Sequence, residues 1–249
     1  MNLLIPDWPA PAWVRSASST RQGGVSQSPF DSLNLALHVD DRAADVVRNR
    51  QRLVEKLTLP GEPRWLNQVH GVTVADLDSA LGELPDADAS ITCAANTVCA
   101  VLTADCLPVL FCDRTGTQVA AAHAGWRGLA AGILEATVAA FAAPPEEILV
   151  WLGPAIGPQA FEVENDVRQA FCDVDPVAVE AFVATRPGHW QADLYQLARQ
   201  RLERVGVNAV YGGGRCTFSE VGDFYSFRRD ANTGRMASII WIEARKNAE

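Results

Sequence analysis

The chain has 249 residues, enough for one large domain or two small ones, and 48% of them are hydrophobic, which is ample for a buried core. A formal net charge of −9 argues against a surface that binds nucleic acid or anionic membranes. The six cysteines include no C-x-x-C pair, which excludes zinc-ribbon and thioredoxin-type motifs, and we expect them to be reduced thiols.

No targeting or membrane signal is visible in the sequence. The N-terminal run MNLLIPDWPAP lacks basic residues and is interrupted by Pro6 and Asp7, unlike a secretory signal peptide. No uninterrupted apolar stretch approaches the ~20 residues that a membrane-spanning helix needs. We therefore expect a cytoplasmic protein that does not act at a membrane.

The first part of the chain is predicted to combine short strands with one amphipathic helix. Apolar residues at helical spacing predict this helix over residues 43–57, with Asp40 or Asp41 as its N-cap. Two strands lie before it, over residues 2–5 and 12–18, and a strand that ends in a turn follows it, over residues 65–71.

The most informative stretch is VLTADCLPVLFCDRTGTQVAAAHAGWRG, residues 101–128. Two runs in it are apolar on both faces, which predicts buried strands that are covered on both sides. Asp105 and Cys106 interrupt the first run, and the second run ends in His123. An earlier predicted strand ends in His70 in the same way. Because an unpaired polar group in a core costs about 1–3 kcal/mol, such side chains are either hydrogen-bonded or functional. We expect function for Asp105, Cys106 and His123, which lie with Arg127 next to a glycine corner, whereas His70 alone is an ambiguous signal.

The remainder of the chain alternates helices with strands. Helices are predicted over residues 129–141, 164–172, 176–184 and 193–205, and strands over residues 148–152, 209–211, 224–230 and 237–242. Asp193 is the predicted N-cap of the last helix, whereas Asp86 and Asp88 are interpreted as turn residues without a chemical role. With no repeat or linker, this order predicts one domain over residues 1–249. Its expected class is α/β (α+β), with three layers around a mixed β-sheet.

Two histidines and one cysteine at strand ends form a plausible set of metal ligands. His70, Cys106 and His123 would leave a fourth coordination position open, which is the pattern of catalytic zinc. The same set occurs in blue-copper sites, which also need a weak axial ligand, often methionine. Met1 and Met236 are the only methionines available for that position. Zinc is therefore preferred, and copper stays possible.

The same residues also permit nucleophilic catalysis. Cys106 would then be the nucleophile and His123 its base, with Asp105 or Asn67 orienting the imidazole. The two functions exclude each other, because a thiolate bound to zinc is not free to attack a substrate. The residues by themselves leave both interpretations open.

A series of motifs runs in order along nearly the whole chain: TRQGGVS, SLNL, NQVHG, LTADCLPVLF, AAHAGWRGL, LGPAIGP..FEV and FYSFRRD..TGRMAS. Over about residues 1–243 this series resembles the YfiH-like family, also called laccase-domain or polyphenol-oxidase-like proteins. One departure is Ala36, where the family usually has glycine after SLNL. That difference concerns the local backbone and not the site.

The resemblance implies zinc bound through His70, Cys106 and His123. It also implies phosphorolysis of purine nucleosides (adenosine, inosine and S-methyl-5′-thioadenosine) together with deamination of adenosine. A copper-dependent polyphenol oxidase and a Cys/His hydrolase are the alternatives within the same resemblance. The expected partners are phosphate and purine nucleosides, without nucleic acid, and the expected state is a monomer or small homo-oligomer.

The implied reaction suggests roles for polar residues in the motifs. Cys106 and His123 would be catalytic as well as ligating. Asp105 would be catalytic by orienting a ligating histidine or by taking a proton. Asn34 and Gln68 would bind the sugar or the base of the substrate.

Phosphate would be oriented by guanidinium groups. Arg21 and Arg127 are assigned to substrate binding on this basis. The strand predicted over residues 224–230 would send Arg228 and Arg229 to opposite faces, so that only one of them enters the site. Arg229 is assigned as the catalytic one.

Overall fold

The computed structural model describes residues 1–79 and 86–244. Its strands are β1 (Leu3–Leu4), β2 (Val14–Ser19), β3 (Val74–Asp76), β4 (Ala89–Thr92), β5 (Val98–Thr103), β6 (Leu107–Asp113), β7 (Val119–Ala124), β8 (Ile148–Leu152), β9 (Glu162–Glu164), β10 (Phe182–Arg186), β11 (His189–Ala192), β12 (Ala209–Gly212) and β13 (Met236–Ile242). Its α-helices are α1 (Ala43–Leu57), α2 (Trp126–Ala131), α3 (Ile133–Ala139), α4 (Asn165–Cys172), α5 (Leu194–Arg204) and α6 (Phe227–Asp230). Two 3₁₀-helices complete the set, η1 (Pro145–Glu147) and η2 (Pro176–Ala181).

Two β-sheets form the centre of the molecule. The larger sheet has the strand order β12-β8-β6-β7-β4-β3, with parallel pairs at both edges and antiparallel pairs between them. The smaller sheet, β1-β2-β13-β5, is antiparallel throughout. A third sheet, β10-β11-β9, packs against α4. The predicted α/β class with a mixed sheet is confirmed.

Side chains from the two faces of the larger sheet belong to two separate hydrophobic cores. Along β6, Leu107, Val109 and Phe111 pack with residues of α2, α3, α4 and α5. Leu110 and Cys112 alternate with them and pack against the smaller sheet. This two-sided burial explains the apolar runs that predict covered strands.

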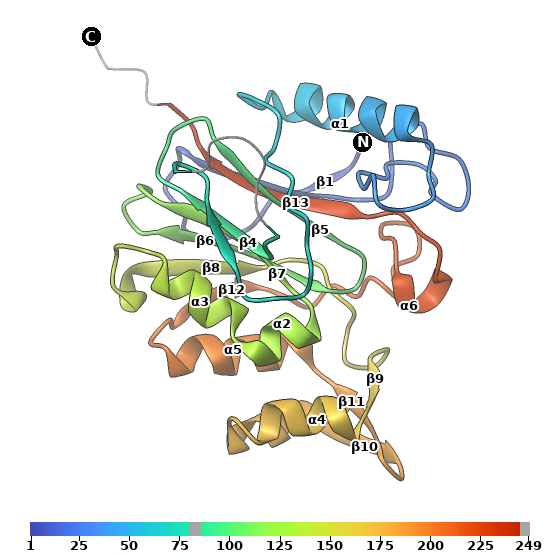
Figure 1. Ribbon diagram of the computed structural model, residues 1–249, viewed down its shortest axis with the longest axis vertical. Helices are drawn as coiled ribbons and strands as arrows, with labels where there is room; N and C mark the ends of the chain where they lie inside the picture. Colours follow the sequence, from blue (N-terminus) through green and yellow to red (C-terminus); the bar gives the residue numbers. More distant parts are fainter. Residues whose placement is uncertain (80–85, 245–249) are drawn as a thin grey trace.

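The outer face of the smaller sheet is covered by α1. Leu53 of this helix packs with Ala100 of β5 and Ile239 of β13, and Figure 1 shows α1 on the opposite side of the sheets from α2, α3 and α5. The helix α1 is therefore a layer beyond the three that the sequence predicts around the mixed sheet. The predicted aspartate cap of this helix is wrong: Arg42 occupies the N-cap position without a side-chain cap, and Asp41 accepts the N–H of Arg42 at 2.8 Å.

Two predicted helices differ in the structure. The helix predicted over residues 129–141 begins earlier, as α2, and Gly132 with φ +104° separates it from α3. The helix predicted over residues 176–184 is η2 followed by β10. Phe182 is buried there and pairs with Ala192 of β11, so strand pairing overrides the local pattern.

Two predicted strands are wrong. The segment predicted over residues 224–230 ends in α6, where the hydroxyl of Ser226 accepts the backbone N–H of Arg229 at 3.3 Å as an N-cap. The segment over residues 65–71 is irregular and has an isolated bridge, between Asn67 and Asp86. No helix in residues 1–79 and 86–244 has both the length and the apolar composition to cross a membrane.

Candidate active site

The three predicted metal ligands lie together at one end of β6 and β7. Cys106 directly precedes β6, and the strand register pairs Pro108 of β6 with His123 of β7. His70 reaches them from the loop before β3, and its Nε2 lies 3.9 Å from Sγ of Cys106. One ligand atom from each residue lies within 4.8 Å of the others. The fold thus brings the three candidate ligands together.

A fully buried carboxylate, Asp88, supports this cluster. It directly precedes β4, which pairs with β7. Its Oδ1 accepts from Nδ1 of His123 at 2.8 Å and from the backbone N–H of His70 at 2.9 Å. Its Oδ2 accepts from the N–H of Gly71 at 2.6 Å and of Val69 at 3.2 Å. The sequence predicts no role for Asp88, because only the pairing of β4 with β7 brings it to His123.

The protonation states of the cluster are coupled. Burial raises the pKa of the Cys106 thiol, but the neighbouring His123 and His70 outweigh it and lower that pKa to about 6. Burial lowers the pKa of His123, but Cys106 and Asp88 outweigh it and raise that pKa to about 9. Without a metal, Cys106 and His123 are therefore a thiolate and an imidazolium at neutral pH. Binding of a metal requires a neutral imidazole, so it releases the proton of His123.

The donor set fits a tetrahedral metal ion. Zinc binds sulfur at about 2.3 Å and nitrogen at about 2.0–2.1 Å, which places its ligand atoms roughly 3.3–3.6 Å apart. The distance of 3.9 Å between Cys106 and His70 is close to this range. Nδ1 of His123 forms a hydrogen bond with the carboxylate of Asp88, which leaves Nε2 to bind the metal. Metal-binding histidines commonly have such a carboxylate partner.

Gly125 allows the ligands to approach the polypeptide backbone. A Cβ atom on Gly125 would lie 2.8 Å from the ring of His70 and 2.9 Å from Sγ of Cys106. A Cβ atom on Gly128 would lie 2.9 Å from the carbonyl oxygen of Gly71. The glycines of the AGWRG motif are thus explained by close packing behind the cluster.

The cluster opens into a cavity of about 450 Å³. Its lining combines aromatic and aliphatic side chains with basic groups: His38, Gln68, His70, Leu102, Thr103, Ala104, Asp105, Cys106, His123, Trp126, Arg127, Ile156, Phe161, Phe227, Arg228 and Arg235. Cavities of this size and composition are typical of small-molecule sites.

Three guanidinium groups line the cavity: those of Arg127, Arg228 and Arg235. Arg127 stacks on the ring of Trp126 at 4.4 Å, and Arg228 lies over the ring of Phe161 at 5.3 Å. Among the described residues, no carboxylate forms an ion pair with any of these three arginines. The cavity is therefore equipped to receive an anion.

Arg235 and His38 extend the basic lining beyond the predicted residues. Burial lowers the pKa of Arg235, and its Nη1 donates to the carbonyl oxygens of Thr233 at 2.8 Å and Gly234 at 3.0 Å. Burial, together with the charges of Arg235 and Arg50, lowers the pKa of His38 and keeps its imidazole neutral. Both residues stand in or near the quoted motifs, but nothing in the sequence indicates that they face the metal ligands.

Comparison with known proteins identifies the family. The family model described as multi-copper polyphenol oxidoreductase laccase matches residues 15–243. The chain belongs to this YfiH-like, laccase-domain family. It is 58% identical to the purine nucleoside phosphorylase PA4543 of Pseudomonas aeruginosa, covering 96% of this chain and 98% of that protein. It is 57% identical to the purine nucleoside phosphorylase YfiH of Escherichia coli, covering 97% of this chain and 99% of that protein.

Solved structures in the same family have the same fold. The Neisseria meningitidis protein NMB0706 superposes with a TM-score of 0.94 at 53% identity, covering 98% of this chain and 100% of that one. YlmD from Geobacillus stearothermophilus superposes with a TM-score of 0.86 at 34% identity, covering 94% of this chain and 93% of that one. The resemblance seen in the sequence motifs is confirmed.

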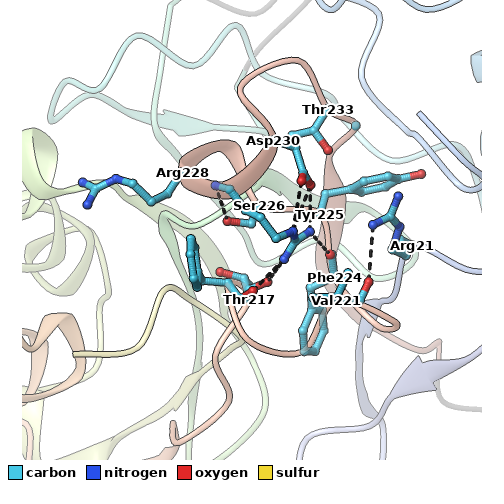
Figure 2. A network of polar contacts seen from close by, with 12 residues as sticks. Arg21, Thr217, Val221, Phe224, Tyr225, Ser226, Arg228, Asp230 and Thr233 are labelled. Carbon is cyan, nitrogen blue, oxygen red and sulfur yellow. Dashed lines mark hydrogen bonds and ion pairs between the residues drawn. The ribbon is translucent and has the colours of Figure 1, made fainter. Parts of the chain in front are cut away.

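In this YfiH-like chain Arg228, and not Arg229, faces the cavity. The guanidinium group of Arg229 donates to the carbonyl oxygens of Thr217, Phe218 and Phe224 at 2.8–2.9 Å and pairs with the carboxylate of the next residue. Figure 2 shows this network, from which the side chain of Arg228 extends away. The catalytic assignment of Arg229 is corrected, because the segment is a helical turn and not an alternating strand.

Two other predicted substrate-binding residues lie outside the cavity lining. The guanidinium group of Arg21 donates to the carbonyl oxygen of Asp31 at 3.0 Å and to that of Val221 at 3.3 Å, the second of which is drawn in Figure 2. Asn34 is fully buried, and its Oδ1 accepts the backbone N–H groups of Ala36 and Arg235 at 3.0 Å. Asn34 therefore supports the segment that carries Arg235, while Arg21 ties two loops together.

Gln68 and Asp105 line the cavity, but their polar atoms have partners within the protein. The side-chain amide of Gln68 bonds the backbone N–H and carbonyl of Leu102 at 2.7 and 2.8 Å. Asp105 accepts from the hydroxyls of Thr217 and Ser226 at 2.6 and 3.0 Å and from the backbone N–H of Arg228 at 2.6 Å. Asp105 thus anchors the start of α6, and the carboxylate that contacts the ring of His123 is that of Asp88.

Proposed function

We propose that the protein is a zinc-dependent purine nucleoside phosphorylase that acts on adenosine, inosine and S-methyl-5′-thioadenosine and also deaminates adenosine. The observation that carries the proposal is one cavity of about 450 Å³ that contains both a His-Cys-His cluster and guanidinium groups without carboxylate partners among the described residues. Relatives at 58% and 57% identity, named purine nucleoside phosphorylases, support the reaction class. We further propose that it acts in the cytoplasm as a monomer or small homo-oligomer, with these small molecules and no nucleic acid as partners.

In this proposal the basic side chains bind the phosphate. Phosphate attacks C1′ of the ribose while the purine departs, and the ribose becomes cation-like in the transition state. Arg127, Arg228 and Arg235 hold the phosphate oxygens by charge-assisted hydrogen bonds, which fix its direction of attack. The aromatic faces of Phe161 and Phe227 provide apolar surface for the purine.

His70, Cys106 and His123 would hold the zinc, which when bound supplies a Lewis acid that lowers the pKa of water for replacement of the adenine amino group. Zinc is preferred over blue copper because the sulfur of Met236 accepts the backbone N–H of Tyr225 at 3.2 Å in the core and does not line the cavity.

A Cys/His hydrolase is the second candidate, and one specific observation favours it. Cys106, His123 and Asp88 stand in the order of a nucleophile, a base and an orienting carboxylate, and the pKa of the thiol is lowered to about 6. A protein of this kind would act without a metal.

Incubation of inosine with and without phosphate tests the proposed function. We expect hypoxanthine and ribose 1-phosphate in equal amounts when phosphate is present, and neither when it is absent, because phosphate is consumed in the reaction. Adenosine without phosphate should give inosine. Hypoxanthine in both inosine incubations would indicate a hydrolase, and oxygen consumption with a phenol would indicate an oxidase. Chromatography of the products distinguishes these outcomes.

A further inference from the structure

One carboxylate connects both ligating histidines. Asp88 is fully buried, and its Oδ1 is shared between Nδ1 of His123 at 2.8 Å and the backbone N–H of His70 at 2.9 Å. The main-chain carbonyl of Asp88 also accepts the backbone N–H of His123 at 2.6 Å. His123 is thus held at its ring and at its backbone by the same residue.

The second oxygen of this carboxylate holds the loop that carries His70. Oδ2 of Asp88 accepts from the N–H groups of Val69 at 3.2 Å and Gly71 at 2.6 Å. His70 lies between them with φ +61°, a left-handed conformation that is unfavourable for a residue with a side chain. Three successive backbone N–H groups donate to the carboxylate of Asp88, and these hydrogen bonds compensate for the free-energy cost of this backbone conformation.

We propose that Asp88 is a positioning residue that orients His70 and His123 together as metal ligands. It fixes the backbone of one histidine and the ring of the other, so the donor atoms converge before a metal binds. The imidazole of His123 donates through Nδ1 to Asp88 and therefore presents Nε2 to the metal. This inference rests on the metal site of the proposed function but not on the reaction with nucleosides.

Asp113 offers a matched control at the opposite end of β6. It is also buried, and its carboxylate accepts the N–H groups of Thr117 and Gln118 at 2.7 Å and the hydroxyls of Thr115 and Thr117. Its carboxylate holds a turn in the same manner as Asp88 holds its loop, but its partners include none of His70, Cys106 and His123. Asp113→Asn should therefore destabilise the fold without changing the metal site.

The test compares Asp88→Asn with Asp113→Asn in zinc affinity, measured by competition with a chromogenic chelator after metal removal. Asparagine keeps the shape of Asp88 but replaces one acceptor oxygen by a donor. We expect Asp88→Asn to weaken zinc binding by about 10–100-fold and to speed hydrogen exchange of amides 69–71. Asp113→Asn should keep the zinc affinity of the wild type, although its metal-free form melts at a lower temperature.

Two outcomes would overturn the inference: an unchanged zinc affinity in Asp88→Asn, or an equal loss of affinity in Asp113→Asn. If Asp88→Asn does not fold, Asp88→Glu retains the charge and displaces the carboxylate by one methylene group, and wild-type affinity in that variant would refute the positional role. Loss of zinc affinity in a protein that never cleaves inosine would reject the proposed reaction and leave this inference standing.

Discussion

Cys106→Ser is expected to lose the bound metal and to lower kcat/KM for inosine phosphorolysis on the order of 10³-fold, as loss of about 4 kcal/mol of transition-state stabilisation implies. The neighbouring imidazoles lower the pKa of the thiol to about 6, so the wild type presents a thiolate at neutral pH. A serine hydroxyl does not ionise there and cannot replace it as a ligand.

Mass spectrometry of protein purified without a nickel column measures this loss as zinc per chain. Cys172→Ser is a suitable control, because Cys172 is a half-buried thiol at the end of α4 that does not line the cavity. It should keep both metal and activity. A Cys106→Ser protein that retains its zinc but is inactive would instead support the cysteine nucleophile.

Arg235→Ala is expected to raise the KM for phosphate by about 10–100-fold, which corresponds to one charge-assisted contact of about 1.5–3 kcal/mol. Arg235 is partly buried, and no described carboxylate forms an ion pair with it, although the charges of Cys106 and Asp105 partly offset the effect of burial on its pKa. Its guanidinium group is therefore available to a bound anion. The KM for inosine should change little, because the substitution removes a phosphate contact. Steady-state kinetics with varied phosphate measure both values.

Arg21→Ala is the matched control for this prediction. Its guanidinium group binds backbone carbonyls of two loops outside the cavity, so its removal should lower the melting temperature without affecting the KM for phosphate. Equal effects of both substitutions on the phosphate KM would place the phosphate away from Arg235.

The elements with long periodic patterns follow from the sequence. The helix over residues 43–57 matches α1, and Asp193 caps α5 as predicted, accepting the N–H groups of Tyr195 and Gln196. Strands β6 and β7 follow from runs that are apolar on both faces. Cys106, directly before β6, and His123, near the end of β7, also follow from the sequence as candidate ligands.

The remaining features depend on contacts that are distant in sequence. Asp88 resembles any turn aspartate until β4 pairs with β7 and brings it to His123. The four residues of α6 are too few to show helical periodicity, so the sequence pattern predicts that Arg228 and Arg229 alternate as in a strand. The position of Arg235 in the cavity likewise depends on how β13 joins the smaller sheet. Local patterns therefore predict the candidate ligands but not the residues that contact them.

One titration tests most directly whether the His-Cys-His cluster binds a catalytic metal in a phosphate-dependent enzyme. Chelator-treated protein receives increasing amounts of zinc, and the phosphate-dependent release of hypoxanthine from inosine is followed. We predict no activity at the start and a linear rise that reaches its plateau at about one zinc per chain. Full activity in the metal-free protein, or an equal release of hypoxanthine without phosphate, would contradict this prediction.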